Sequence, residues 1–186
     1  MDAMKLLLER VSAVKLQDPG PSAEELETIL RAALRAPDHG RLRPWRFIVI
    51  EKEQRGKFGA LMADALAARD AKATADGLAR ERQKAMRAPL ILIVAAAIKP
   101  SEKVPAVEQI VSAGAAAEHI MLAVQALGYG AMWRTGAPAY DARIKEGLGL
   151  KHDDAIVGIF YIGTPAAQPI EMPRPELRDF VTRWEG

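Results

Sequence analysis

Apolar side chains occupy nearly every face of one long stretch, residues 107–127, which only Glu118 and His119 interrupt near its middle. A stretch of this kind is typical of a buried helix about 30 Å long, and the polar interruption argues against a membrane span. Glu108, Ser112 and His119 fall within about 40° of one another on such a helix. The pattern therefore predicts a central, buried helix with one thin polar seam.

Small residues give this helix a second feature. Residues 113–117 read Ala-Gly-Ala-Ala-Ala, and such side chains let another backbone approach closely, within the chain or across a dimer. Gly128, with Gly130 close behind, is suited to end the helix, and a short strand over 131–135 follows. Two interpretations stay open. The segment is either a core helix with a glycine cap, or a strand that emerges from the core to hold an anionic ligand through its arginine.

The hydrophobic pattern predicts further helices and strands on both sides. Ser22 and Glu25 form a capping box ahead of apolar residues spaced at i, i+3, i+4, i+7 and i+8, which predicts an amphipathic helix. The other expected elements are a helix over 2–11 capped by Asp2, a central strand over 45–51, helices within 53–88, a buried strand over 89–95, a helix over 138–148 and a strand over 155–163. Strands 90–95, 131–135 and 156–163 are expected in the middle of an α/β or α+β sandwich.

Composition narrows the classes of protein. The 186 residues predict a single domain, 1–186, with residues 53–88 as a possible lid and a tail over 166–186 that is stable only when docked on the domain or on a partner. A net charge of +2 gives no reason to expect nucleic acid or a membrane as partner. Without cysteine, and with only three scattered histidines, no thiol chemistry and no metal site is expected. The first residues lack a basic leader, so a soluble, cytoplasmic protein is expected.

Known nucleotide and hydrolase motifs do not fit. A dinucleotide fingerprint follows a strand and opens a helix, whereas here a helix precedes Gly128 and a strand follows Gly130. The sequence also lacks GxxxxGK[ST], HExxH and GxSxG, which excludes P-loop, zincin and α/β-hydrolase sites.

Three further segments each allow two interpretations. The Arg, Ser and Lys within residues 10–15 form either a phosphate grip or a solvated helix end. The loop 35–45 is dense in side chains typical of a site, yet Asp38 and Gly40 are also ordinary turn residues. Residues 53–88 form either a lid over a site or a solvated pair of helices.

Four motifs follow one another along the chain. Residues 10–15 read R-x-S-x-x-K, and residues 36–39 and 44–47 read A-P-D-H and P-W-R-F. Residues 128–136 read GYGAMWRTG, and residues 162–165 at the end of the last strand read IGTP. In this order and over nearly the whole chain, they resemble the FMN-dependent nitroreductase family, whose R-R-S-x-R segment and A-P-S-x-x-N-x-Q-P-W block stand at the first two places. The last two motifs are similar to those of its short, YdjA-type branch.

The resemblance implies an α+β, three-layer sandwich in which helices flank a central mixed sheet and the alanine-rich helix is buried. It also implies a homodimer with FMN sites at the subunit interface. The N-terminal Arg and Ser would meet the phosphate and ribityl chain, the loop before Pro-Trp would approach from the other subunit, and the segment after the central helix would complete the site. The implied cofactor-binding residues are Arg10, Val11 through its backbone, Ser12, Arg35, His39, Trp133, Arg134 and Thr135. In this arrangement Arg10 and Arg134 both offer guanidinium groups to the phosphate.

Two positions depart from the family pattern. Val11 stands where a second Arg is common, so that side chain contributes no phosphate contact. Arg43 stands where Gln is frequent, and the loop has no Asn, so the resemblance leaves the flavin-ring contacts of this loop open.

The implied activity is that of an NAD(P)H oxidoreductase. NADPH or NADH would reduce FMN by hydride transfer, and a nitroaromatic, quinone or similar small-molecule acceptor would then take the electrons in a ping-pong cycle. No protein nucleophile or essential general acid is expected, because the cofactor carries the chemistry. The alternatives are a flavin-binding or structural homodimer without turnover, and a flavin-dependent dehydrogenase or dehalogenase on the same scaffold. The choice between NADPH and NADH stays open.

Overall fold

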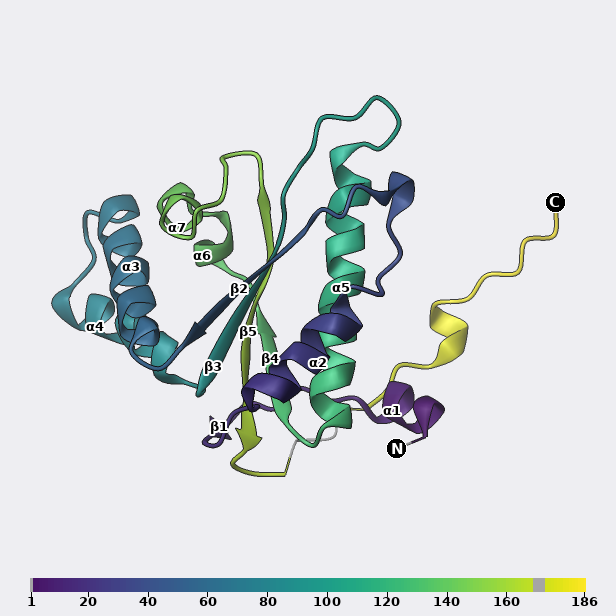
Figure 1. The fold of residues 1–186 in the computed structure, drawn as a ribbon, viewed down its shortest axis with the longest axis horizontal. Helices are drawn as coiled ribbons and strands as arrows, with labels where there is room; N and C mark the ends of the chain where they lie inside the picture. Colours follow the sequence, from purple (N-terminus) through teal and green to yellow (C-terminus); the bar gives the residue numbers. More distant parts are fainter. Residues whose placement is uncertain (1, 169–172) are drawn as a thin grey trace.

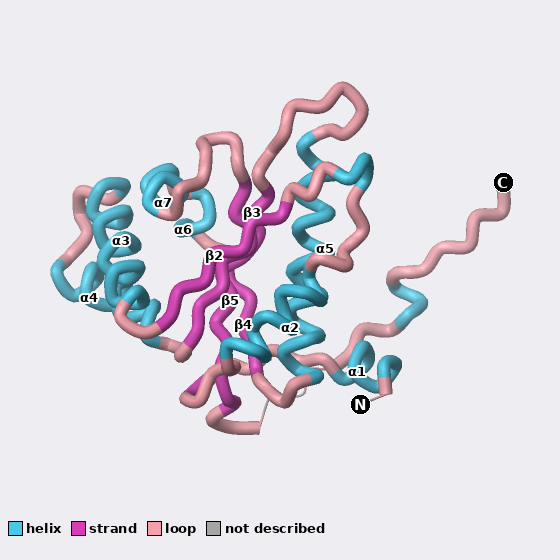
Figure 2. Tube along the Cα trace, in the orientation of Figure 1, coloured by secondary structure: helices cyan, strands magenta, loops and turns pink. Residues whose placement is uncertain are grey.

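A computed structural model describes residues 2–168 and 173–186, and in it a sheet lies between two layers of helices (Figures 1 and 2). The strands are β1 (Leu16–Gln17), β2 (Trp45–Glu51), β3 (Leu90–Ala96), β4 (Gly130–Arg134) and β5 (Ala155–Pro165). Their order is β1-β5-β3-β2, and β4 pairs with β5 as well. The α+β three-layer architecture predicted from the sequence is confirmed.

All pairings of the described strands are antiparallel, so the prediction of a mixed sheet is wrong. Continuous apolar strands such as β3, in which all seven residues are buried, are typical of sheets covered on both faces. Helices cover both faces here too, so the apolar run indicates burial without indicating strand direction. The prediction that residues 45–51 form a central strand is also wrong, because β3 is the one described strand that pairs with β2, and Val49 is 39% exposed.

Besides three short 3₁₀ helices, the described part of the fold has seven α-helices. They are α1 (Ala3–Glu9), α2 (Ala23–Ala33), α3 (Gln54–Arg69), α4 (Ala75–Gln83), α5 (Ala106–Ala126), α6 (Ala137–Tyr140) and α7 (Ala142–Gly147). Helices α2 and α5 lie on one side of the sheet, and α3, α4, α6 and α7 on the other (Figure 2). The predicted caps are confirmed, since Asp2 accepts from the Lys5 N–H and Ser22 and Glu25 form a reciprocal capping box. The single helix predicted over 138–148 is wrong, because Asp141 has extended backbone and caps α7 instead of continuing α6.

Each face of the sheet has its own hydrophobic core. The core under α2 and α5 includes Ile120, Leu92 and Phe160, all fully buried. The core under α3 includes Phe58 and Met62. The first half of the predicted excursion over 53–88 is therefore a core helix.

Helix α5 is buried on the side that faces the sheet and α2. Its predicted polar seam exists: buried Ser112 accepts from Trp45 Nε1 at 3.1 Å and donates to the Pro37 carbonyl at 2.7 Å, and His119 Nδ1 contacts the Ala32 carbonyl. The opposite side is open in the single chain, where Val111 is 65% exposed. The expectation of burial on all sides is wrong for the isolated chain. Across residues 2–168 and 173–186, no helix has the length and apolar run that a membrane crossing requires.

The C-terminal segment extends away from the body of the molecule (Figure 1). Residues 169–172 of the predicted tail lie outside the described residues. Beyond them, Arg174 donates to the backbone carbonyls of Leu8 and Arg10, while Phe180 and Trp184 are 73% and 90% exposed.

Candidate functional site

The N-terminal segment crosses the outer edge of strand β4. The Ala13 N–H donates to the Ala131 carbonyl at 2.9 Å, whereas the other edge of β4 pairs with β5. This crossing requires glycine at 130, because a Cβ there would lie 2.7 Å from the Ala13 Cβ. Backbone groups alternate along a strand, so the N–H and C=O of Trp133 face the same outer edge as those of Ala131. No described residue forms a backbone hydrogen bond with Trp133 on that edge.

Side chains of β4 alternate between the two faces of the sheet. Trp133 belongs to the core under α5, where its Nε1–H donates to the Val157 carbonyl at 3.1 Å and its ring packs against Phe160. Met132 belongs to the core under α3, and Arg134, two residues further, points to the same face as Met132. The Trp133 indole is thus used in packing, and only its backbone is available to a ligand at the edge.

A cleft with two adjoining lobes lies on the α3 side of β4. The lobes have volumes of about 600 and 710 Å³, and both are lined by Arg87, Arg134 and Tyr161. Thr135 lines the first lobe, and Lys15 lines the second. Burial raises the pKa of the Tyr161 phenol, and the opposing charges of Arg87 and Arg134 offset only part of that rise. Tyr161 therefore presents a protonated hydroxyl at neutral pH.

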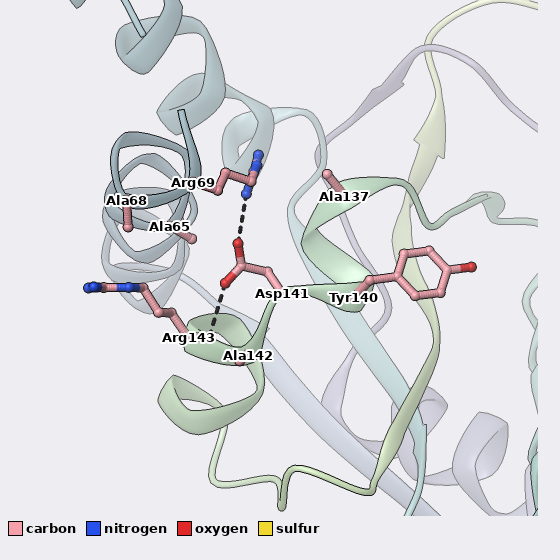
Figure 3. A pocket seen from close by; sticks show the side chains of 8 residues that line it. All are labelled: Ala65, Ala68, Arg69, Ala137, Tyr140, Asp141, Ala142 and Arg143. Carbon is pink, nitrogen blue, oxygen red and sulfur yellow. Dashed lines mark hydrogen bonds and ion pairs between the residues drawn. The ribbon is translucent and has the colours of Figure 1, made fainter. Parts of the chain in front are cut away.

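Several charges around the cleft are already paired. Arg69 Nη1 contacts Asp141 Oδ2 at 2.9 Å, and Asp141 Oδ1 accepts from the Arg143 N–H, as Figure 3 shows for the neighbouring pocket between α3 and α6. Glu81, only 6% exposed, pairs with Lys84 through Oε2. Asp141 and Glu81 thus neutralise two of the cations at the cleft.

Arg10, Val11 and Ser12 lie together at the α5 side of the sheet. Arg10 Nε is 3.3 Å from Glu118 Oε1, and the Val11 N–H donates to Gln125 Oε1 at 3.1 Å. Both acceptors belong to α5. Arg134 points to the opposite face, so the structure does not bring Arg10 and Arg134 to one point within a single chain.

His39 lies near the N-terminal end of α5, and Arg35 lies just after α2. His39 Nδ1 pairs with Glu108, and Arg35 is exposed. Glu108 precedes Glu118, the partner of Arg10, by a distance of about 15 Å along the helix. Within one chain, the predicted site residues are thus dispersed: His39 lies at the N-terminal end of α5, whereas Arg10 and Val11 contact its C-terminal half.

Arg87 and Tyr161 line the cleft but were not among the predicted site residues. Arg87 lies shortly before β3, and Tyr161 lies within an apolar strand, so neither position carries a sequence pattern that marks a site. Lys15, which belongs to the R-x-S-x-x-K motif of residues 10–15, lines the second lobe but is not among the predicted cofactor-binding residues. Across residues 2–168 and 173–186, no group of three or more His, Cys, Asp or Glu residues is placed to hold a metal ion.

Comparisons with known proteins give a consistent result. The model of the Nitroreductase family matches residues 7–164. The predicted NAD(P)H nitroreductase YdjA of Escherichia coli strain K12 is 41% identical over 178 residues, which cover 94% of this chain and 96% of that protein. A predicted NAD(P)H nitroreductase of Haemophilus influenzae strain Rd is 39% identical over 184 residues, covering 98% and 99%.

Solved structures share the fold. The nitroreductase-like family protein of Bacillus cereus superposes with a TM-score of 0.86 at 22% identity, covering 100% of this chain and 97% of that one. A predicted nitroreductase of Desulfovibrio desulfuricans, solved in complex with FMN, superposes with a TM-score of 0.72 at 24% identity, covering 99% and 98%.

Proposed function

The chain belongs to the nitroreductase family, and on this premise we propose that it is an FMN-dependent NAD(P)H oxidoreductase. The observation that carries the proposal is the likeness, over nearly the whole chain, to two predicted NAD(P)H nitroreductases at 41% and 39% identity. We propose a nitroaromatic or quinone as the second substrate, in a ping-pong cycle. For a nitro group, one turn converts NAD(P)H, a proton and R–NO₂ into NAD(P)⁺, R–NO and water.

The residues along β4 fit an FMN group. The free edge at Trp133 offers a backbone N–H and C=O, and the cleft beside it is roomy and bordered by cations. Arg10 and Ser12 offer a guanidinium and a hydroxyl, the groups that a phosphate and a ribityl chain need. FMN would supply the hydride-accepting chemistry when bound. The part of this chain is to hold the cofactor against β4 and to orient it toward the cleft.

We also propose that a second copy of the chain completes the site. Val107 and Val111 expose apolar surface on the open side of α5, and Gly114 in the same stripe would let a partner helix approach closely. His39 lies near this open side of α5, beside Val107 and Val111, and neither His39 nor Arg35 lines the cleft of its own chain. Across a two-fold interface, each chain would supply them to the other chain's cofactor.

The proposal is tested by the visible absorption spectrum of the purified protein after addition of FMN and desalting. We expect a retained flavin spectrum at about one FMN per chain. Addition of NADPH or NADH should then bleach the flavin band, and a nitroaromatic or quinone should restore it. A protein that retains no FMN contradicts the proposal, and one that holds FMN but never turns over supports a flavin-binding homodimer instead.

A substitution of Arg10 tests the cofactor assignment. We expect Arg10→Gln to raise the dissociation constant of FMN about tenfold or more, because a charge-assisted hydrogen bond to the phosphate is lost. FMN fluorescence quenching measures this constant. Arg31→Gln is the matched control, since it removes an exposed guanidinium on α2 that, among the described residues, pairs only with Glu27. An FMN affinity that is the same in both variants contradicts the assignment.

A further inference from the structure

Helix α4 and the 3₁₀ helix that follows it, η2 (Lys84–Met86), carry a row of polar side chains on one face. Neighbours in this row are three or four residues apart, the spacing that brings side chains together on a helix surface. The row lines a pocket of about 540 Å³ beside α4, the outer pocket, and consists of Arg80, Gln83, Lys84 and Arg87.

The outer pocket adjoins the cofactor cleft without being part of it. Glu81, Lys84 and Arg87 line both the outer pocket and the first lobe of the cleft, so they form a shared wall. Arg80 and Gln83 line the outer pocket and neither lobe of the cleft. A ligand seated in the first lobe can therefore continue across the shared wall into the outer pocket.

Positive charge dominates the outer pocket. Three cations line it together with one carboxylate, Glu81, whose Oε2 pairs with Lys84. Among the described residues, the Arg80 guanidinium forms no ion pair, and neither Arg80 nor Gln83 forms a side-chain hydrogen bond. Arginines on helix surfaces are commonly solvated, so the position of Arg80 beside the cleft carries more weight than its lack of a partner.

The packing of α4 on α3 fixes the direction of this row. A Cβ at Gly59 of α3 would lie 2.5 Å from the Arg82 carbonyl oxygen, so glycine lets α4 pack directly against α3. Ala85 is fully buried and Glu81 is 6% exposed, which shows the side of the segment that faces the core. Arg80 and Gln83 are both exposed, so the outer pocket lies on a well-packed base and opens to solvent.

A second pocket also adjoins the first lobe, between α3 and α6 (Figure 3). It shares Arg69 and Ala137 with the lobe, but Asp141 neutralises Arg69. Arg143 is thus the one cation of that pocket without an ion pair among the described residues. The outer pocket is therefore the more strongly cationic of the two surfaces beside the lobe.

Among the proposed reactants, NAD(P)H has a large anionic part that takes no part in the chemistry. Its nicotinamide ring has to reach the flavin in the cleft, so its adenosine diphosphate part has to lie on a surface that adjoins the cleft. Guanidinium groups bind phosphate oxygens through forked donors, and a glutamine amide adds a neutral donor. The outer pocket has both the position and the chemistry for this part of the molecule.

We propose that Arg80 and Gln83 bind the pyrophosphate of NAD(P)H, whose nicotinamide ring lies in the first lobe of the cleft. The proposal rests on the proposed function, since it assigns a subsite to the reductant of that reaction. Binding energy from this non-reacting part of the reductant helps to hold the nicotinamide ring against the cofactor. Arg80 lines neither lobe, so its role is distinct from that of the cations that border the FMN site.

The experiment follows only the reduction of the flavin, so the acceptor plays no part in it. Bleaching of the flavin band is measured by anaerobic stopped flow in the FMN-loaded wild type, Arg80→Gln, Arg80→Lys and Arg82→Gln. The last is the matched control, because Arg82 is exposed on the same helix but does not line the outer pocket. One reductant is NADPH or NADH, whichever bleaches the flavin faster. The other is 1-benzyl-1,4-dihydronicotinamide, which has the reacting ring without the adenosine diphosphate part.

A second readout does not depend on flavin reduction. The dissociation constant of ADP is measured for each FMN-loaded protein by isothermal titration calorimetry, and that of FMN by fluorescence quenching. Because Arg80 lies outside both lobes, the dissociation constant of FMN should be the same in the wild type and in every variant.

We expect Arg80→Gln to lower the second-order rate constant of reduction by NAD(P)H, and to raise the dissociation constant of ADP, by about fivefold or more, since a charge-assisted contact to phosphate is lost. With 1-benzyl-1,4-dihydronicotinamide the change should stay within about twofold, because this reductant has no phosphate. Arg80→Lys should keep part of the affinity, since lysine retains the charge without the forked donors. The affinity for ADP should fall with added salt.

An equal loss of rate with both reductants would overturn the proposal, because the effect of Arg80 would then lie at the flavin. So would an FMN-loaded wild type that binds no ADP, or an ADP affinity that is the same in Arg80→Gln and Arg82→Gln. Weaker FMN binding in Arg80→Gln would assign Arg80 to the cofactor instead. If neither reductant bleaches the flavin of the wild type, the proposed function fails, and the ADP titrations alone decide whether Arg80 belongs to an adenosine diphosphate site.

Discussion

Single side chains connect segments of this chain that are distant in sequence. The Tyr129 hydroxyl, just after α5, donates to Glu25 Oε2 at 2.9 Å on the first turn of α2. The same carboxylate accepts from the Ser22 N–H in the capping box. These contacts lower the pKa of Glu25, with the Ser22 backbone N–H as the largest cause, followed by the Tyr129 hydroxyl. The cap of α2 thus depends on the charge of Glu25.

The stability that this contact contributes should depend on pH. A carboxyl group whose pKa is lowered by folding stabilises the protein above its unfolded pKa, and the contribution is lost as the pH falls through the folded pKa. We therefore expect Tyr129→Phe to lower the urea midpoint at about pH 7 and to have a smaller effect at a pH low enough to protonate Glu25 in the folded protein. Tyr140→Phe, at an exposed tyrosine without a hydrogen bond, is the control. An equal loss at both pH values would mean that the charge of Glu25 is irrelevant.

Residue-level prediction from the sequence succeeded where the interaction is local. The Ser22–Glu25 and Asp2–Lys5 caps follow from spacings of three residues, and both are present. The cleft could not be predicted in the same way. Arg87 precedes β3, Arg134 ends β4 and Tyr161 lies within β5, so only strand pairing brings them together.

At the scale of elements, one glycine decides how β4 and β5 pack. A Cβ at Gly158 would collide with the indole of Trp133 and the ring of Phe160. Next to it, the register between β3 and β5 shifts between Val94 and Ala95. Gly158 therefore leaves space for the Trp133 indole in the core under α5. This packing fixes the position of the C-terminal end of β4, which borders the cleft.

Filling this space should destabilise the fold. We expect Gly158→Ala to reduce the free energy of unfolding by about 1–3 kcal/mol, the range for overpacking a filled core. Urea denaturation followed by tryptophan fluorescence measures the change and also reports on Trp133. Gly56→Ala is the control, because a Cβ at this exposed position of α3 meets nothing within 4 Å; it should be neutral or stabilise by up to about 1 kcal/mol. If Gly158→Ala is as stable as the wild type, Trp133 can repack freely.

Most elements were predictable because their hydrophobic period is strong. The predicted helix over 107–127 and strands over 89–95 and 155–163 agree with α5, β3 and β5 to within two residues. The position of each strand within the sheet was harder to predict from the sequence. Strand β2 is nearly continuous in apolar residues, yet it lies at the edge of the sheet, because its apolar side chains pack on the two faces: Ile50 belongs to the core under α3 and Phe47 to the core under α5. The hydrophobic period of a strand indicates that it is buried, but it does not indicate which strands lie beside it in the sheet.

At the scale of the whole molecule, apolar side chains remain exposed on the surface that carries the open side of α5. Val107 and Val111 are 62% and 65% exposed on α5, and Leu8 is 68% exposed on α1. The C-terminal segment adds Phe180 and Trp184, and Figure 1 shows it extending from the same side, past α1. Exposed apolar surface of this kind is typical of an interface. The small residues in the middle of α5 also predict a close helix–helix contact, within the chain or across a dimer. The sequence does not identify the helix that makes this contact.

An acidic residue in the middle of this surface should therefore dissociate the proposed homodimer. We expect Val111→Glu to raise the dimer dissociation constant by about 30-fold or more, since a charge would be buried against the partner. Sedimentation velocity over a range of protein concentrations measures it. Tyr140→Glu places the same charge on an exposed residue of the opposite helical layer and should leave the assembly intact. Because Arg35 and His39 would come from the partner, the monomeric variant should also retain FMN more weakly than the control. A wild type that sediments as a monomer at all concentrations would contradict the homodimer, whereas a dimeric Val111→Glu variant with normal FMN retention would move the interface away from α5.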